Sequence, residues 1–156
     1  MLSSEIVINN FIECAKKYCI FIENSYTLTL KKLAKNSLVL LSELYLKVLQ
    51  LPDIEPSNNR IVHIKIKTPK WRGFDEYENY WEIFNPYKLK EPVIGSLSDD
   101  LLDIYRDLRQ GFLMIEQDQL NDITDAIWYW KFTCFTHWGE HTVSALRALH
   151  FIINKD

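Results

Sequence analysis

Apolar residues recur every three or four positions in the first third of the chain, which is the spacing of an α-helix that buries one face. The capping residue Ser3 precedes the first run, which predicts a helix over about residues 4–23 with core positions Val7, Phe11, Cys14, Ala15, Tyr18 and Ile22. A second run, from Leu30 to Leu49, predicts a helix that stops at Leu51-Pro52 because proline lacks a backbone N–H. The short join between the runs predicts an antiparallel helix hairpin.

The most distinct helix start in the chain lies at residues 95–100, where capping serines precede Asp99 and Asp100. Apolar positions continue from there to Ile115 and predict a third long helix. Asp100, Asp103 and Asp107 align on another side of this helix, and aligned carboxylates repel one another. The favourable field at a helix start accounts for Asp99 and Asp100. Asp103 and Asp107 are not explained in that way and need a partner group.

A fourth long helix is predicted over Trp128 to His150, a segment that holds three of the five Trp and three of the four His. With successive residues about 100° apart, one stripe is assigned to the core: Trp128, Phe132, Phe135, Val143, Leu146, Leu149 and Ile153. The opposite face holds Trp130, Cys134, His137, His141, Ala148 and Ile152. Because that face is not a charged one, we expect the helix to be covered on two sides.

Cys134, His137 and His141 fall at i, i+3 and i+7 on that second face, a spacing that could hold a soft or borderline metal ion. Residues 137–141 also read HWGEH, the H-x-x-E-H order of inverted zinc peptidases. Those enzymes take a further acidic ligand from well downstream, whereas only fifteen residues follow His141, which argues against a peptidase. Gly139 favours close packing of a neighbour. The alternative to a metal site is a pair of hydrogen-bonded histidines in a polar seam of the bundle.

Residues from about 53 to 95 form an irregular, aromatic-rich insertion between the second and third helices. Alternation of apolar and polar residues over 60–67 predicts a short strand, and residues 76–84 predict two helical turns that Asn85-Pro86 ends. The aromatic residues of the insertion are expected either to plug one end of the bundle or to form a recognition surface. The candidates for contact with a partner are Trp71, Glu76, Tyr77, Tyr80 and Trp81.

The composition favours one helical domain over residues 1–156, because 47% of the residues are hydrophobic and only four are Gly. A net charge of −3 argues against non-specific binding to nucleic acid or to an acidic membrane. No apolar segment reaches the ~18 residues of a membrane span, and the first residues lack signal-peptide features, so a cytoplasmic protein is expected. Cys14, Cys19 and Cys134 are expected to be buried free thiols.

Several segments carry a resemblance to a known family. They are SLSDDLLDIYRDL at residues 96–108, the aromatic positions Trp128, Phe132 and Phe135 with HWGEH at 137–141, ALRALH at 145–150, and the earlier LYL at 44–46 with Leu51-Pro52. Together they resemble a bacterial family known as domain of unknown function 5063, over most of the chain outside residues 53–95. The resemblance implies a small helical cytoplasmic protein and brings no activity, cofactor or catalytic residue.

The expected fold is all-α: a bundle of about four main helices, with the insertion supplying at most a single short strand or a hairpin. The first functional hypothesis is a non-enzymatic protein that binds a protein partner, as a neutralising (immunity) or adaptor protein would. No cofactor is expected in that case. The acidic charge, the aromatic insertion and the lack of a complete catalytic constellation favour it.

The alternative hypothesis is a metal-dependent hydrolase or a small-ligand-binding protein whose site lies between two helices. Asp103 and Asp107 from one helix would face His137 and His141 from the other, and a divalent metal ion is the cofactor this hypothesis allows. It predicts at least one of these carboxylates within about 2.6–3.2 Å of an imidazole nitrogen, or one water away. A third hypothesis is a structural network that fixes the register of the bundle and also includes Tyr105, Arg106 and Trp138.

Overall fold

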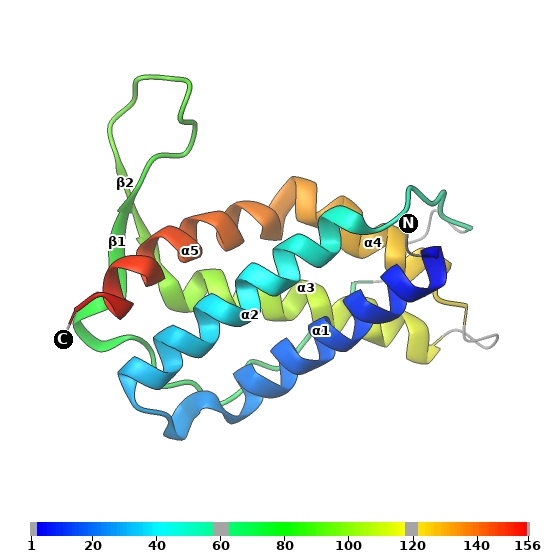
Figure 1. Ribbon diagram of the computed structural model, residues 1–156, viewed down its shortest axis with the longest axis horizontal. Coiled ribbons are helices and arrows are strands. Elements are labelled where there is room, and N and C mark those ends of the chain that lie inside the picture. The colour runs from blue at the N-terminus through cyan, green and yellow to red at the C-terminus, as the bar shows by residue number, and fades with distance from the viewer. Residues whose placement is uncertain (1–2, 58–62, 118–121, 156) are drawn as a thin grey trace.

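The computed structural model describes residues 3–57, 63–117 and 122–155, which form a bundle of long helices with a two-stranded hairpin beside it (Figure 1). In chain order the elements are α1 (Ser4–Asn24), η1 (Ser25–Thr27), α2 (Leu30–Gln50), η2 (Asp75–Tyr77), β1 (Asn79–Glu82), β2 (Val93–Ser96), α3 (Leu97–Gln117), α4 (Thr124–Thr133), η3 (Cys134–Trp138) and α5 (Gly139–Ile153). Since α4, η3 and α5 follow one another without interruption, they make one long helix, called the C-terminal helix below. The prediction of an all-α bundle with four main helices is confirmed.

Helices α1 and α2 begin and end where the sequence predicted. The hydroxyl of Ser3 accepts the backbone N–H of Ile6 at 3.4 Å, and the hydroxyl of Thr29 accepts that of Lys32 at 3.3 Å, so both helices have a side-chain cap. The two helices pack against each other, and α2 also packs against α5. Helix α3 packs against α1, α4 and α5 and so closes the bundle.

The centre of the bundle is filled by Trp130 of α4. Its indole lies 5.3 Å from the ring of Phe11 and 5.0 Å from that of Phe112, and its N–H donates to the carbonyl of Leu108 at 3.0 Å. A side chain at Gly111 would place its Cβ 2.2 Å from this indole, so the glycine lets α3 approach the ring directly. Among the described helices, none is both long enough and apolar enough to cross a membrane.

The insertion differs from the sequence prediction in where its strands lie. Residues 63–67 are not a strand, and residues 60–62 lie outside the described part of the chain. The strands are instead β1 and β2, which pair antiparallel from Asn79 with Ser96 to Glu82 with Val93. The helical turns predicted over 76–84 are therefore wrong beyond the short η2. Exposed and half-buried residues alternate along β1, but its sequence, Asn-Tyr-Trp-Glu, does not alternate polar and apolar residues. Its partner strand lies beyond a ten-residue connection, so local spacing does not reveal the pairing.

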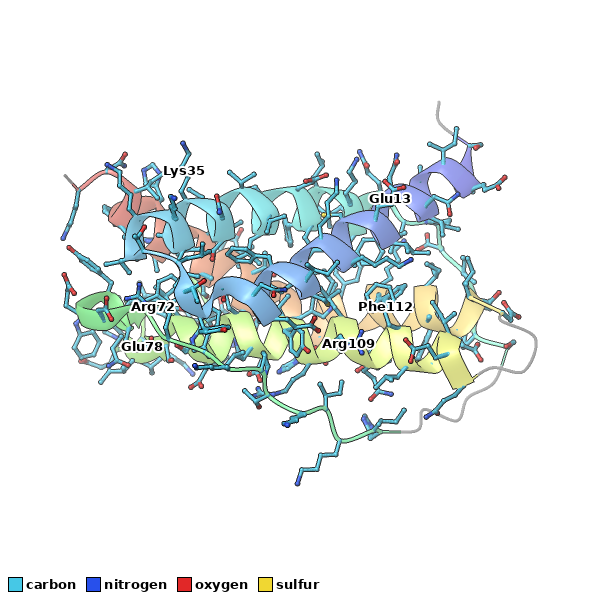
Figure 2. The ribbon with its side chains drawn as sticks, turned by 90° about the horizontal axis from the view of Figure 1, so that it is seen from below. Glu13, Lys35, Arg72, Glu78, Arg109 and Phe112 are labelled. Atoms are coloured by element: carbon cyan, nitrogen blue, oxygen red, sulfur yellow. The ribbon has the colours of Figure 1, made fainter. Side chains whose placement is uncertain are left out.

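Glu78 joins this hairpin to the start of α3, at the end of the bundle where Figure 2 also shows Arg72. Its carboxylate accepts hydrogen bonds from the backbone N–H groups of Phe74 and Ser98, both at 2.9 Å, and from the hydroxyls of Ser96 and Ser98 at 2.8 and 2.7 Å. Ser96 in turn caps α3 by accepting the N–H of Asp99. Burial by itself would raise the pKa of Glu78, but these hydrogen bonds outweigh it and lower the pKa.

We expect Glu78→Gln to lower the free energy of unfolding by about 1–3 kcal/mol at pH 7, because the amide loses the charge that strengthens these hydrogen bonds. A carboxyl with a lowered folded-state pKa contributes stability above its unfolded pKa near 4.5, and this contribution is lost as pH falls through the folded pKa. The difference between wild type and variant should therefore shrink from pH 7 to pH 3 in urea unfolding followed by circular dichroism.

The matched control is Glu76→Gln, which changes an exposed residue of the same turn and should leave stability within about 0.5 kcal/mol of wild type at both pH values. A Glu78→Gln difference that stays constant between pH 7 and pH 3 would contradict the role assigned to the Glu78 charge.

Candidate functional site

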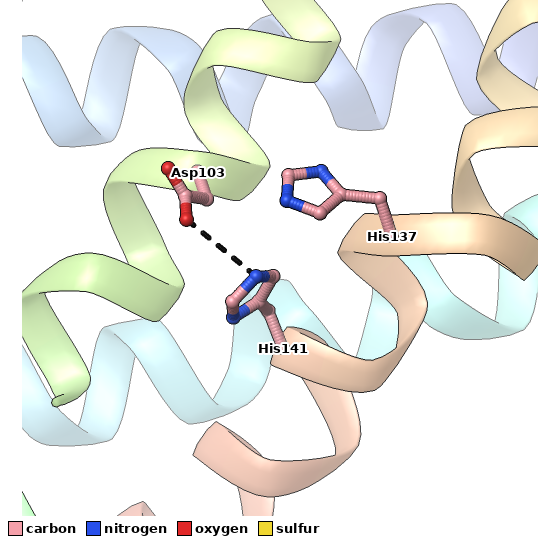
Figure 3. Close-up of side chains that lie close together, drawn as sticks. All are labelled: Asp103, His137 and His141. Atoms are coloured by element: carbon pink, nitrogen blue, oxygen red, sulfur yellow. Dashed lines mark ion pairs between the residues drawn. The ribbon is translucent and has the colours of Figure 1, made fainter. Parts of the chain in front are cut away.

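Acidic residues of α3 face two histidines of the C-terminal helix. Asp100, Asp103 and Asp107 lie along one side of α3, while His137 lies in η3 and His141 one turn later in α5. Helix α3 contacts both η3 and α5, and Figure 3 shows the side chains of Asp103, His137 and His141 directed toward one another across this contact. We call these five residues the Asp–His cluster.

The first pair in the cluster joins His137 to Asp107. The Nδ1 atom of His137 lies 2.6 Å from Asp107 Oδ2, which meets the distance predicted from the sequence. Tyr129 of α4 donates its hydroxyl to the other carboxylate oxygen at 3.3 Å. Burial raises the pKa of Asp107, and the hydrogen bond with His137 offsets only part of this effect. The imidazole of His137 is 48% exposed, so this pair reaches from the interior to the surface.

The second pair joins His141 to Asp100. The Nδ1 atom of His141 lies 2.7 Å from Asp100 Oδ1, and its Nε2 atom lies 3.5 Å from Asp103 Oδ2. The hydrogen bond with Asp100 raises the pKa of His141, although burial acts in the opposite direction. The rings of His141 and His137 meet edge to face, with centroids 4.9 Å apart.

Asp100 has a larger role than its position in the first turn of α3 indicated. Its side chain is buried, and besides His141 it contacts Tyr80 of β1, whose hydroxyl donates to Asp100 Oδ2 at 2.5 Å. Burial and this carboxylate raise the pKa of Tyr80 far above its usual value. The helix-start explanation of Asp100 is therefore incomplete. The only sequence signal for its second role was its alignment with Asp103 and Asp107.

The π-helical turn η3 places both histidines toward α3. In a regular α-helix, residues four apart turn about 40° away from a common face, but a wider π turn cancels this drift. Buried residues therefore follow at intervals of four through Trp130, Cys134, Trp138 and Thr142. The core stripe predicted from a 100° rotation is wrong in consequence: Phe132, Phe135 and Val143 are exposed, Trp128, Leu146 and Ile153 are half-buried, and Leu149 is buried.

Gly139 is part of the same turn. A side chain there would place its Cβ 2.2 Å from the carbonyl oxygen of Cys134, one π turn earlier. The close approach predicted for this glycine is therefore made by its own helix and not by a neighbouring one.

Asp103, His137 and His141 each offer one ligand atom, and these atoms all lie within 4.8 Å of one another. Cys134, a ligand candidate from the sequence, is buried and does not belong to this group. Because an ionised carboxylate can only accept hydrogen bonds, the contacts with Asp107 and Asp100 place an N–H at Nδ1 of each histidine. The Nε2 atoms are then the nitrogens left to bind an ion. Arg106 pairs with the second oxygen of Asp103 and supplies positive charge at the edge of the cluster.

A hollow of ≈ 310 Å³ opens beside the cluster. Its walls come from the hairpin on one side and from η3 and α5 on the other, and include Glu82, Phe84, Ile94, His137, Glu140 and His141. The hairpin and the two histidines therefore line the same hollow, which no pattern in the sequence predicted.

The remaining site candidates lie at different depths. Trp81 is 71% exposed and Glu76 is also exposed, whereas Tyr77, Tyr80 and Trp71 are half-buried. The indole N–H of Trp71 donates to the hydroxyl of Ser98 at 2.6 Å, which ties it to α3. Two members of the predicted structural network have other partners: the hydroxyl of Tyr105 donates to Glu23 at 2.9 Å, and the indole of Trp138 to the carbonyl of Trp130 at 3.1 Å.

These features describe a small helical-bundle protein with an Asp–His cluster beneath a hairpin. Residues 71–155 match the model of the family described as Domain of unknown function (DUF5063), and since this is more than half of the chain, the protein belongs to that family. The sequence-based family prediction is confirmed.

The fold is similar to that of a solved structure, the crystal structure of protein BF1032 from Bacteroides fragilis, with a TM-score of 0.78. The two sequences are 20% identical, and the likeness covers 96% of this chain and 94% of that chain. At this identity the similarity shows a shared fold alone. No curated protein matches the sequence.

Replacing Gly139 tests the π turn. An exposed helical glycine changed to alanine usually gains about 1 kcal/mol of stability, but we expect Gly139→Ala to lose about 1–3 kcal/mol because its methyl group would overlap the Cys134 carbonyl. The measurement is urea unfolding followed by circular dichroism. Thr136→Ala, an exposed position in the same turn, should change stability by less than about 0.5 kcal/mol. A stabilised Gly139→Ala variant would show that the π turn is not required.

Proposed function

We propose that the protein binds one divalent transition-metal ion between α3 and the C-terminal helix, with Asp103, His137 and His141 as ligands. The observation that supports this proposal is the pair of carboxylate contacts at Nδ1 of the histidines, at 2.6 and 2.7 Å. In metalloproteins a ligating histidine almost always donates its other ring N–H to a carboxylate, a backbone carbonyl or water, which fixes the ring and raises its basicity. Asp107 and Asp100 are in position to do this for His137 and His141.

The spacing of the three ligands suits an ion after a small movement. Two donors on one tetrahedral zinc ion, each about 2.1 Å from it, lie roughly 3.4 Å apart. The 3.5 Å between His141 Nε2 and Asp103 Oδ2 already fits this value. The widest separation in the group, up to 4.8 Å, requires one side chain to move inward. The half-exposed imidazole of His137 has the freedom to do so.

The donor set also indicates the kind of ion and site. Two imidazole nitrogens and one carboxylate oxygen suit zinc, iron(II) or manganese(II) better than calcium or magnesium, which prefer oxygen ligands. Three protein ligands leave further coordination positions free, as in catalytic metal sites. The hollow beside His137 and His141 offers room for a small ligand at those positions. This supports the alternative hypothesis of the sequence analysis, a metal-dependent hydrolase or small-ligand-binding protein.

We expect protein purified without chelator to contain near-stoichiometric zinc, iron or manganese in elemental analysis. His137→Ala and His141→Ala should each remove most of this metal. Asp107→Asn keeps all three ligands but weakens the hydrogen bond that orients the His137 ring. The affinity of this variant for the metal ion should therefore fall by about 10–100-fold in calorimetric titration of the chelator-treated protein.

The matched control is His150→Ala, which removes an exposed histidine of the same helix that lies outside the cluster and should leave metal content and affinity unchanged. Metal binding that is equally weak in wild type and in the His137→Ala and His141→Ala variants would show that the proposal is wrong. If those variants also lose thermal stability, the cluster is the structural network of the third hypothesis.

We also propose a protein partner as a second candidate function, in line with the neutralising or adaptor hypothesis. The exposure of Trp81 supports it, since tryptophan is enriched at interfaces. A photo-crosslinking amino acid at Trp81 should form an adduct with one defined protein in cells, and the same probe at Ile20, an exposed apolar position on α1, should not. Adducts of the same pattern from both positions would contradict this candidate. A cytoplasmic location remains a prediction.

A further inference from the structure

The hairpin extends away from the bundle beside α5, as Figure 1 shows. We call residues 79–96 the arm: β1, β2 and the connection 83–92 at its tip. Its base is tied to α3 by Tyr80 and Glu78, but its strands and tip carry large apolar side chains that are more than half exposed. They are Trp81, Ile83, Phe84, Tyr87, Leu89 and Ile94.

The apolar area on the arm is larger than a monomer usually exposes. From the area that a large side chain presents, these six residues expose on the order of 900 Å². The largest apolar patch on a typical monomer is about 300–600 Å² and is often a binding site. A stable protein–protein interface buries roughly 800 Å² on each partner. Summed over its two faces, the arm therefore exposes about as much apolar area as one side of such an interface buries.

The strands of the arm are also incompletely paired. Within the described residues, β1 and β2 pair only with each other, so each leaves one edge without a backbone partner. A two-stranded hairpin is marginally stable in water unless it packs against another surface. Beyond its base, the arm gains packing only if another molecule covers it.

A groove lies between the arm and α5, with a volume of ≈ 520 Å³. Trp81, Phe84 and Val143 give it apolar walls, and Glu82 and Glu140 outnumber Arg147 among its charged residues, so its net charge is negative. The tip of the arm has a net positive charge, because Lys88 and Lys90, on either side of Leu89, outnumber Glu91. Tip and groove are therefore complementary in both polarity and charge.

We propose that two copies of this chain associate through their arms, which lie antiparallel about a two-fold axis so that the tip of each enters the groove of the other. This arrangement brings Lys88 and Lys90 of one copy to Glu82 and Glu140 of the other and covers Leu89 and Phe84. Two-fold dimers are the commonest protein oligomers, and their interface needs one patch that is complementary to itself. The arm and its groove together form such a patch. Because Glu82, Phe84 and Glu140 also line the hollow beside the Asp–His cluster, each copy would close the other's hollow.

Sedimentation velocity tests the association directly. Wild-type protein at micromolar concentrations should sediment with about twice the 18.6 kDa mass of one chain. The double variant Phe84→Glu, Leu89→Glu should sediment as a monomer with the helix content of the wild-type protein. Ile20→Glu is the control, because it places a carboxylate on an exposed apolar position of α1, away from the arm. It should remain dimeric.

The tip-to-groove arrangement has its own test. Lys88→Glu with Lys90→Glu should weaken the dimer at least tenfold, and adding Glu140→Lys should restore part of the affinity. Leu89→Cys combined with Glu140→Cys should give a dimer-sized band on a non-reducing gel after mild oxidation. The native thiols do not compete, because burial raises the pKa of Cys14, Cys19 and Cys134 to about 12.

Wild-type protein that sediments as a monomer at all concentrations would overturn the proposal. The arm would then be a binding surface for a different protein. A dimer that persists in the Phe84→Glu, Leu89→Glu variant would overturn it as well, because the interface would lie elsewhere. If the cysteine experiment gives only a monomer-sized product, the tip of one copy does not enter the groove of the other, and the proposed arrangement is wrong.

Discussion

The packing of Trp130 against α3 is the contact on which most of this structure depends. Its indole occupies the space above Gly111, lies against Phe11 and Phe112, and donates its N–H to the backbone of α3, so the two helices can neither slide nor separate without losing several contacts at once. This fit sets the register of α3 against the C-terminal helix. That register pairs Asp107 with His137 and, two turns earlier on α3, Asp100 with His141.

The Asp–His cluster joins two parts of the molecule that differ in how closely they are packed. On one side is the tightly packed bundle, and on the other the hairpin, which has few contacts of its own. Tyr80 connects them because its hydroxyl donates to Asp100, which also holds His141. A movement of the hairpin would therefore displace the Asp100 carboxylate and, with it, the imidazole of His141. The hollow at the cluster and the groove along α5 share Glu82, Phe84 and Glu140. A ligand that moves these side chains in one of the two spaces would therefore change the shape of the other.

Local patterns predicted the helices but not which face of the last helix is buried. The caps at Ser3 and Thr29 and the proline after Leu51 act within a few residues, so α1 and α2 were predicted almost to the residue. Phe132, Phe135 and Val143 were assigned to the core because the rotation per residue was taken as constant, and η3 breaks that assumption. Asp103, Asp107, His137 and His141 were singled out because their residue types needed partners. Asp100 was left out of the site because the helix start already explained it. Tyr80 was predicted only as a contact for a partner, because Asp100 lies twenty residues away in the sequence.

The sequence by itself determined the number of main helices, the bounds of α1 and α2, the family, and the residue types capable of forming a site, because each depends on spacing or chemistry within one segment. Only the tertiary structure decided the pairing of each aspartate with a histidine, the π turn that directs both rings to α3, and the strand pairing of the hairpin. These depend on contacts between segments far apart in the chain, where small differences in packing decide which of several locally acceptable arrangements is formed. Gly139 illustrates the division: its sequence position indicated a close approach, and the fold showed that the carbonyl of Cys134 makes it.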